Sequence, residues 1–143
     1  MESKYSTCAI LADRHIALAE GVRGLLETAF ETVYVVADSQ SLREGAHRLM
    51  PGLIVLDLSL AGPEFSGLLK EVRDLSPESR VIALSVHDQA TVARLALASG
   101  AHGVVLKRDI GSDLQSAIDA VLGGDWYVSH GFGLPECVPK ATA

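Results

Sequence analysis

The sequence contains few cysteines, the residues that cross-link many small or secreted domains. Only two of its 143 residues are cysteine, Cys8 and Cys137, and they stand far apart in no metal-binding or redox spacing. We therefore expect free thiols in a cytoplasmic protein rather than a disulfide framework. A chain of this length buries roughly 68–70% of its unfolded surface without such cross-links, so we expect one domain.

Long apolar runs and basic clusters are also missing. No stretch of 18 apolar residues occurs, so no membrane-spanning segment is expected, and the apolar stretch near the start is interrupted too soon for a signal peptide. The chain has 12 basic and 18 acidic residues, a net charge of −6, and its longest basic run is Lys107-Arg108. This balance argues against direct nucleic-acid binding, which relies on Lys and Arg to neutralise phosphates.

The sequence does contain five apolar runs that alternate with five helical patterns. Runs this short and this rich in Val, Ile and Leu are typical of strands buried on both faces of a parallel sheet. They are Thr7–Ala12, Thr32–Ala37, Leu53–Asp57, Arg80–Ser85 and Gly103–Leu106. Their alternation with helices predicts a parallel sheet that is covered by helices on both faces.

Several helical patterns carry start and stop signals. The second has a capping-box pattern from Ser41 to Glu44, which predicts a helix beginning near Ser41. The fourth ends at Gly100, a residue suited to a left-handed helix stop, and the fifth has a second capping pattern that starts at Ser112. Residues 125–143 show no clear period and are expected to form a tail or local packing.

Polar residues close four of the predicted strands. Ligand crevices in open parallel sheets lie at the carboxyl ends of the strands, so these residues are the candidates for a site. Asp57 follows the third strand, with Ser85, Lys107 and Asp13 at the ends of the fourth, fifth and first. A carboxylate nucleophile, a hydroxyl and an ammonium together suit attack on a phosphoryl group. Asp13 adds a carboxylate of the kind that helps to hold Mg²⁺.

Four segments resemble the receiver domain of bacterial two-component response regulators. In order they are AILADRH, PGLIVLDLSLAG, VIALSVHD and GAHGVVLKRDI, with 28 residues from Asp57 to Ser85 and 22 from Ser85 to Lys107. The ending AIDAVLGGDWYVS is similar to the NarL/FixJ subgroup, whose receivers usually precede a helix-turn-helix DNA-binding domain. The resemblance runs from about Thr7 to Gly124.

The resemblance implies a flavodoxin-like fold and a signalling function. The fold is a single three-layer, doubly wound (βα)5 domain with a parallel five-stranded sheet of order 2-1-3-4-5. The receiver domain would occupy residues 6–124, and 125–143 would be a tail or the start of a linker. Too little chain remains for a DNA-binding domain, so this output is expected to be absent from this chain.

The resemblance also implies a role for each site residue. Asp57 would accept a phosphoryl group from a sensor histidine kinase, Ser85 would bond its oxygen and move on activation, and Lys107 would pair with it. Asp13, Asp57 and the backbone carbonyl of Ser59 would hold Mg²⁺. The implied protein is a cytoplasmic switch rather than an enzyme, with the kinase as partner and a homodimer as a possible state.

Three positions depart from the family pattern. The acidic pair reads Asp13-Arg14, Val104 stands at the usual aromatic switch position, and Ala61 replaces a proline. Exchanging an acid for Arg14 could cost up to several kcal/mol of Mg²⁺ affinity. Its guanidinium could instead pair with Asp57 or Asp13 and replace part of the metal's charge. One alternative is therefore a degenerate receiver that acts without phosphorylation.

Two other classes are weaker alternatives. An aspartate-nucleophile phosphatase needs Asp-x-Asp, but Ser59 occupies the position of the second acid. A flavin- or dinucleotide-binding protein needs a glycine-rich phosphate loop, and the segment 12–15 after the first strand has none. His15 and His87 are interpreted as ordinary loop histidines, and Trp126 as a packing anchor.

Overall fold

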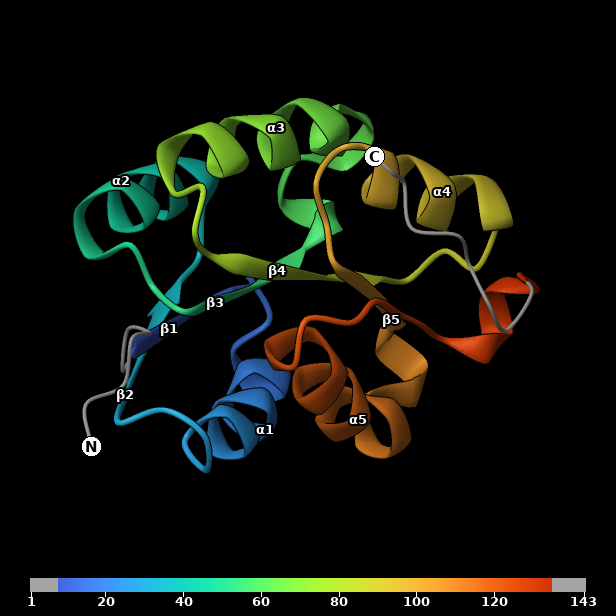
Figure 1. The fold of residues 1–143 in the computed structure, drawn as a ribbon, viewed down its shortest axis with the longest axis horizontal. Coiled ribbons are helices and arrows are strands. Elements are labelled where there is room, and N and C mark those ends of the chain that lie inside the picture. The colour runs from blue at the N-terminus through green and yellow to red at the C-terminus, as the bar shows by residue number, and fades with distance from the viewer. Residues whose placement is uncertain (1–7, 135–143) are drawn as a thin grey trace.

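The computed structural model describes residues 8–134, which form a parallel sheet between two layers of helices (Figure 1). The sheet has six strands in the order β2-β1-β3-β4-β5-β6. They are β1 (Cys8–Ala12), β2 (Thr32–Val36), β3 (Leu53–Asp57), β4 (Arg80–Ser85), β5 (Gly103–Leu106) and β6 (Tyr127–Val128). The expected order 2-1-3-4-5 is confirmed, and one short strand is added beyond β5.

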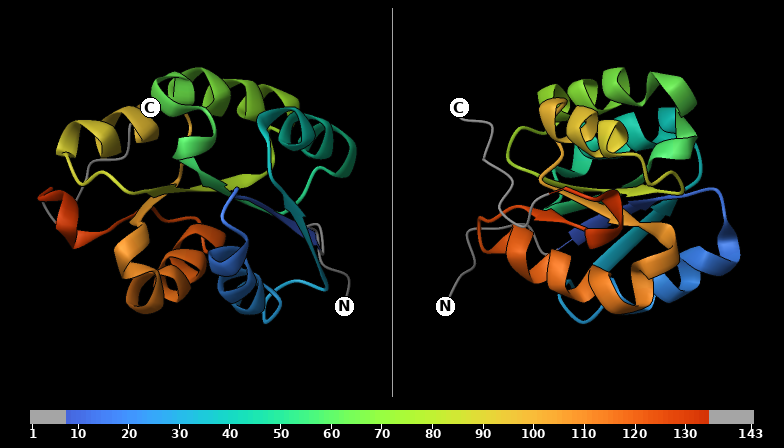
Figure 2. Two further views of the ribbon diagram at one scale, coloured as in Figure 1. Left: turned by 180° about the vertical axis from the view of Figure 1, so that it is seen from behind. Right: turned by 90° about the vertical axis from the view of Figure 1, so that its right-hand side faces the viewer.

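Helices cover both faces of the sheet, as the alternating pattern predicted. Figures 1 and 2 show α2, α3 and α4 on one face and α1 and α5 on the other. Their bounds are α1 (Ile16–Leu26), α2 (Ser39–Leu49), α3 (Phe65–Leu75), α4 (Ala90–Ala98) and α5 (Ile110–Leu122). None of the helices within residues 8–134 has the length and apolar character needed to cross a membrane.

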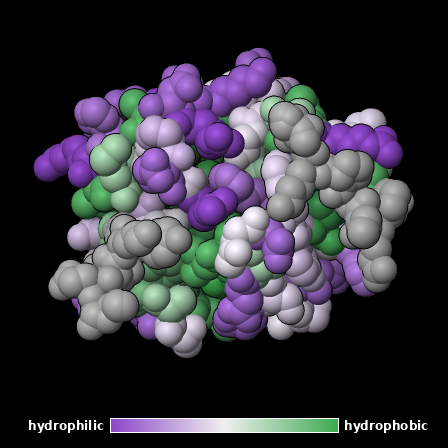
Figure 3. Space-filling view, in the orientation of Figure 1, coloured by the Kyte–Doolittle hydropathy of each residue, from purple (hydrophilic) through white to green (hydrophobic). Residues whose placement is uncertain are grey.

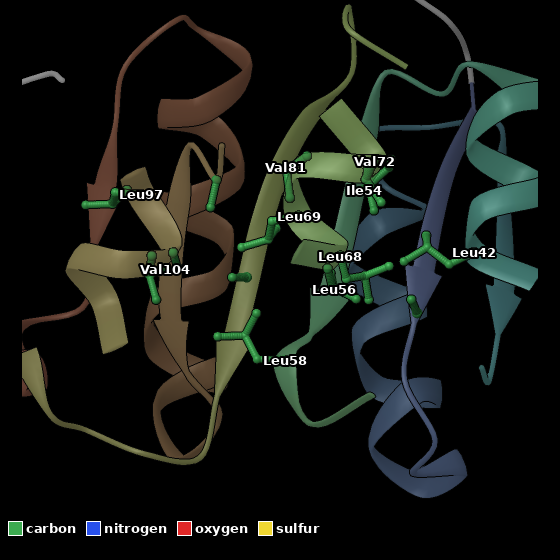
Figure 4. Close-up of a cluster of buried hydrophobic side chains, with 14 of the residues drawn as sticks. Leu42, Ile54, Leu56, Leu58, Leu68, Leu69, Val72, Val81, Leu97 and Val104 are labelled. Carbon is green, nitrogen blue, oxygen red and sulfur yellow. The ribbon is translucent and has the colours of Figure 1, made fainter. Parts of the chain in front are cut away.

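The apolar strands are buried on both sides, which accounts for their continuous Val, Ile and Leu content. Successive side chains of a strand point to opposite faces. Accordingly, Ile54 and Leu56 of β3 lie in the core beneath α2, α3 and α4, which Figure 4 shows, whereas Val55 lies in the core beneath α1 and α5. Each of the three is fully buried.

The segment after α5 is part of the domain at least as far as residue 134. β6 pairs in parallel with β5, and Phe132, on a 3-10 turn (His130–Phe132), is only 2% exposed. Trp126 packs partly buried against the core, as expected of a packing anchor. A two-residue strand is too short to produce a readable period, which is why the sequence did not reveal it. Cys137 and the rest of the expected tail lie outside the described residues.

Two predicted helix starts are wrong. Helix α2 begins at Ser39, because the side chain of Asp38, not of Ser41, caps it by accepting the Ser41 N–H at 2.7 Å. Helix α5 begins at Ile110 rather than Ser112, since a short 3-10 turn (Lys107–Asp109) leads directly into it. The stop at Gly100 is confirmed by a φ of +125°.

Candidate functional site

The strand register brings the predicted site residues to one edge of the sheet. β1 and β3 are neighbouring parallel strands. Asp13 directly follows the last paired residue of β1, and Asp57 directly follows its partner in β3. β4 and β5 are paired up to Ser85, and Lys107 follows the residue opposite Ser85. The sheet therefore places four residues from four strands at the same carboxyl edge.

Asp57 is a buried carboxylate that is held by several donors. Its residue exposure is 0%. One oxygen accepts the Ser59 N–H at 3.1 Å, and the other accepts the Ser59 hydroxyl at 2.7 Å and the Lys107 ammonium at 3.0 Å. Burial by itself would raise the pKa of Asp57, but the bonds from Ser59 and Lys107 outweigh burial and lower that pKa below its ordinary value. The carboxylate is thus ionised at neutral pH.

Lys107 joins the two carboxylates through a single buried ammonium. Its side chain is 8% exposed, and its Nζ lies 3.0 Å from Asp57 Oδ2 and 3.2 Å from Asp13 Oδ2. The hydrogen bond to Asp13 goes to the other oxygen, Oδ1, at 3.4 Å. The buried Oδ2 of Asp13 thus has ion-pair proximity but no hydrogen bond from the described residues. One cation faces two anions here, so the three groups retain a net charge of −1.

His15 belongs to this cluster, although its sequence position suggested an ordinary loop residue. Its Nδ1 lies 3.1 Å from Asp13 Oδ1, 3.2 Å from Lys107 Nζ and 3.7 Å from Asp57 Oδ2. Its backbone N–H also donates to Asp13 Oδ1 at 2.9 Å, which folds the chain back over the carboxylate. The signal in the sequence was the spacing of two residues after Asp13, which suits such an Asx turn.

Arg14 does not make the pairing that the sequence suggested. Its side chain is exposed, and no hydrogen bond or ion pair joins it to any of residues 8–134. The Asx turn between Asp13 and His15 brings the imidazole to the carboxylates and leaves the intervening side chain in solvent. The cation that neutralises Asp13 and Asp57 in this structure is Lys107.

Ser85 lies at the same edge but is engaged in its own loop. Its hydroxyl donates to the His87 carbonyl at 2.7 Å and accepts the His87 N–H at 3.0 Å. The hydroxyl must turn away from this loop to reach a group on Asp57. Ser59 and Ser85 line a mostly apolar cavity of about 360 Å³. Val104, at the usual aromatic switch position, is fully buried in β5.

The cluster has the donor set of a divalent cation site. Ligand atoms of Asp13, His15 and Asp57 all lie within 4.8 Å of one another. Adjacent ligands on an octahedral ion with bonds of about 2.1 Å are separated by about 3.0 Å, close to the 3.1 Å from His15 Nδ1 to Asp13 Oδ1. The Oδ2 atom of Asp13, which accepts no hydrogen bond from the described residues, is a further oxygen atom that suits metal binding. These residues therefore fit a cation, provided that the Lys107 ammonium withdraws from between them.

The fold and the site together define a doubly wound α/β domain with an acidic pocket that contains a lysine. The model of the response regulator receiver domain family matches residues 9–119. The chain therefore belongs to the response regulator receiver domain family. The curated relatives include proteins named as transcriptional regulatory proteins, and the domain is that of two-component signalling proteins.

Two relatives and two solved structures illustrate the likeness. The chain is 29% identical over 127 residues to the transcriptional regulatory protein MctR of Rhizobium johnstonii, covering 85% of this chain and 58% of MctR. It is 30% identical over 133 residues to the nitrate/nitrite response regulator NarL of Escherichia coli, covering 91% of this chain and 61% of NarL. The chain thus spans somewhat more than half of these regulators.

Of the solved structures, a LuxR-family response regulator from Aurantimonas superposes with a TM-score of 0.78 at 26% identity, covering 88% of this chain and 91% of the other. The non-phosphorylated receiver domain of RcsB from Escherichia coli superposes with a TM-score of 0.72 at 27% identity, covering 87% and 98%. Both superpositions support the overall fold described above.

Proposed function

We propose that this receiver accepts a phosphoryl group on Asp57 from a phosphohistidine of a sensor kinase. A carboxylate oxygen of Asp57 attacks phosphorus, the P–O bond forms as the P–N bond breaks, and the departing imidazole nitrogen takes up a proton. The observation that carries the proposal is the state of Asp57: it is buried, ionised by a lowered pKa, and hydrogen-bonded to Lys107 and Ser59.

The neighbouring side chains would then serve the new phosphoryl group. Lys107 would keep one bond to Asp57 and direct its other N–H groups to a phosphoryl oxygen. Ser85 would exchange its bonds with His87 for a bond to another phosphoryl oxygen. That exchange would release the loop after β4, and in this way the chemistry at Asp57 would reach the surface of α4.

The proposed cation is Mg²⁺, held by Asp13, Asp57 and the backbone carbonyl of Ser59. When bound, the ion would neutralise charge on the transferring phosphoryl group. Arg14 weakens the site because it replaces an acid with a cation at the neighbouring position. His15 would add a third side-chain ligand that partly compensates, since its Nδ1 lies beside both carboxylates.

A degenerate receiver that acts without phosphate is the second candidate. It is favoured by the contacts of Lys107, which already reaches both carboxylates. In addition, Arg14 supplies no metal ligand. The phosphatase alternative has no such support, because Ser59 stands where the second acid is needed and its hydroxyl donates to Asp57. We accordingly propose a signalling switch rather than an enzyme that turns over substrate.

We further propose that the protein acts in the cytoplasm, with a sensor histidine kinase as partner and a homodimer as one of its states. RcsB, a protein of the same fold at 23% identity, is known as dimers bound to DNA. For this chain we propose no direct DNA contact, because its net charge is −6 and its basic residues form no run longer than two.

Beryllofluoride, which imitates an acyl phosphate, separates these candidates. With Mg²⁺ present, we expect it to shift the backbone amide resonances of Ser85 and His87, and we expect no shift for Asp57→Asn. A degenerate receiver would give no shift in the parent protein at any beryllofluoride concentration. Shifts of equal size in Asp57→Asn would show that the acceptor is a different residue.

A further inference from the structure

A second hollow lies at the opposite edge of the sheet from Asp57. Its volume is about 490 Å³, and the ends of α3 and α4 and the start of β4 surround it. β4 separates the two edges by five residue steps, roughly 17 Å. The loops that lead into β4 and β5 run in front in Figure 1, and hydrophilic side chains gather near the middle of this face in Figure 3.

The hollow gathers positive charge in an acidic protein. Its wall carries two aromatic rings, three cations and one acid, namely His102, Trp126, Lys70, Arg73, Arg80 and Asp74. None of the three cations forms an ion pair with a partner in residues 8–134. Asp74 offsets one of the three positive charges, so the lining of the hollow has a net charge of +2, with His102 neutral. Burial, and after it the charges of Arg80 and Arg73, lower the pKa of His102 to about 4. The two arginines therefore act electrostatically on a ring in the wall of the hollow.

Arg73 is held in position by the backbone of the α4–β5 loop. Its Nη1 donates to the Gly100 carbonyl at 3.2 Å. Gly100 has a φ of +125°, and a Cβ atom there would lie 2.5 Å from Arg73 Cγ. The glycine thus serves the helix stop and also leaves the space in which the arginine lies. Arg73 is an exposed residue whose guanidinium is oriented by this hydrogen bond.

The two rings form an aromatic side of the same hollow. The centroids of His102 and Trp126 lie 6.1 Å apart with their planes tilted by 47°. The Nδ1 of His102 accepts the Val81 N–H at 3.0 Å, so the neutral ring carries its proton on Nε2 and keeps that donor for another partner. The hollow therefore combines guanidinium groups, a neutral N–H donor and apolar ring surface.

We propose that this hollow binds a phosphate-bearing molecule of the nucleotide class. Arg73 and Arg80 would hold the phosphates through paired N–H groups, and the rings of Trp126 and His102 would contact the base. The volume lies within the range of roughly 300–1,000 Å³ that is usual for small-molecule sites. An acidic peptide would use the same cations but would leave the ring surface unexplained.

ADP is the probe for this site, and Trp126 is the reporter because it is the only tryptophan in the chain. We expect ADP to change Trp126 fluorescence saturably at low salt, more tightly than pyrophosphate or adenosine alone. Arg80→Gln should weaken ADP binding at least fivefold. Arg94→Gln is the matched control, because Arg94 is exposed on α4 outside the hollow, and it should change binding less than twofold.

Three results would overturn the proposal. They are no saturable signal at millimolar ADP, equal weakening by Arg80→Gln and Arg94→Gln, and pyrophosphate binding as tight as ADP binding. A response to an acidic peptide with none to ADP would assign the hollow to a protein partner instead. Asp57→Asn should bind ADP like the parent, since its site lies at the other edge of the sheet, so this proposal stands or falls separately from phosphorylation.

Discussion

Replacing Lys107 with Met removes the ammonium that, among residues 8–134, contacts both buried carboxylates. The side chains of Asp13, Asp57 and Lys107 are 0%, 1% and 8% exposed, so water can replace the ammonium only if the pocket opens. Met keeps most of the volume of the lysine stem and removes its charge. The variant therefore isolates the electrostatic part of the interaction from its packing.

The expected loss of stability is large. Removing one partner of a buried ion pair costs about 3–5 kcal/mol, and the lower end applies here because Ser59 still donates two bonds to Asp57. We expect the free energy of unfolding to fall by about 3 kcal/mol at pH 7. With a slope of about 2 kcal/mol per M, the urea midpoint falls by about 1.5 M.

A fall in pH changes the stability of the parent and of Lys107→Met in different ways. In the parent, the lowered pKa of Asp57 contributes stability that is present above the ordinary value of 3.8 and is lost as the pH falls through the folded pKa. Without Lys107, burial is opposed only by the bonds from Ser59, so the pKa of Asp57 is higher in the variant than in the parent, and protonation relieves the variant at a higher pH. The stability deficit of Lys107→Met should therefore shrink as the pH falls from 7 toward 4.

Urea unfolding followed by Trp126 fluorescence at pH 7 and at lower pH measures both effects. Arg108→Met is the matched control, because its pair with Asp88 is exposed and should contribute less than about 0.5 kcal/mol. A deficit below 1 kcal/mol for Lys107→Met, or the same deficit at every pH, would refute the reasoning.

Four further predictions concern single groups. Arg14→Asp replaces a cation near the proposed ion with an anion, worth about 1 kcal/mol after screening by solvent and salt, so calorimetry should show Mg²⁺ binding about fivefold tighter; unchanged binding would contradict this. His15→Gln should weaken Zn²⁺ binding at least tenfold and Mg²⁺ binding much less, because imidazole suits zinc; unchanged Zn²⁺ binding would exclude His15 as a ligand. Ser59→Ala should raise the pKa of Asp57, measurable from carboxyl carbon shifts, by removing a hydroxyl donor; an unchanged pKa would contradict it. The imidazole of His102 should titrate near pH 4 by NMR, and a midpoint near 6.5 would show that it is not buried as described.

Much of the fold was predictable from the sequence because parallel strands and their helices have strong local signals. Leu53–Asp57 is an apolar run of four residues closed by an aspartate, and the structure shows that strand with the same bounds. Helix starts were less predictable, since a helix can be capped by any nearby oxygen acceptor. Asp38 and Ser41 both suit the role, and the sequence offers no measure of which backbone position is extended enough to take it.

The candidate site was likewise predictable only in part from the sequence. The positions of Asp13, Asp57, Ser85 and Lys107 at one edge follow from strand ends, which the apolar runs define. The direction of individual side chains does not follow, because it depends on turns of two or three residues. The Asx turn at Asp13 brings in His15, which the sequence suggested to be an ordinary loop residue, and leaves in solvent Arg14, which the sequence suggested as the partner.

The most direct test of the central claim is to incubate the protein with acetyl phosphate and Mg²⁺ and to locate the label by intact mass and peptide mapping. We predict a single acid-stable, alkali-labile acyl phosphate on Asp57, lost in Asp57→Asn and formed faster in Arg14→Asp. The account would be contradicted by a parent protein that stays unlabelled under conditions in which Arg14→Asp is labelled, or by a phosphoryl group found on any other residue.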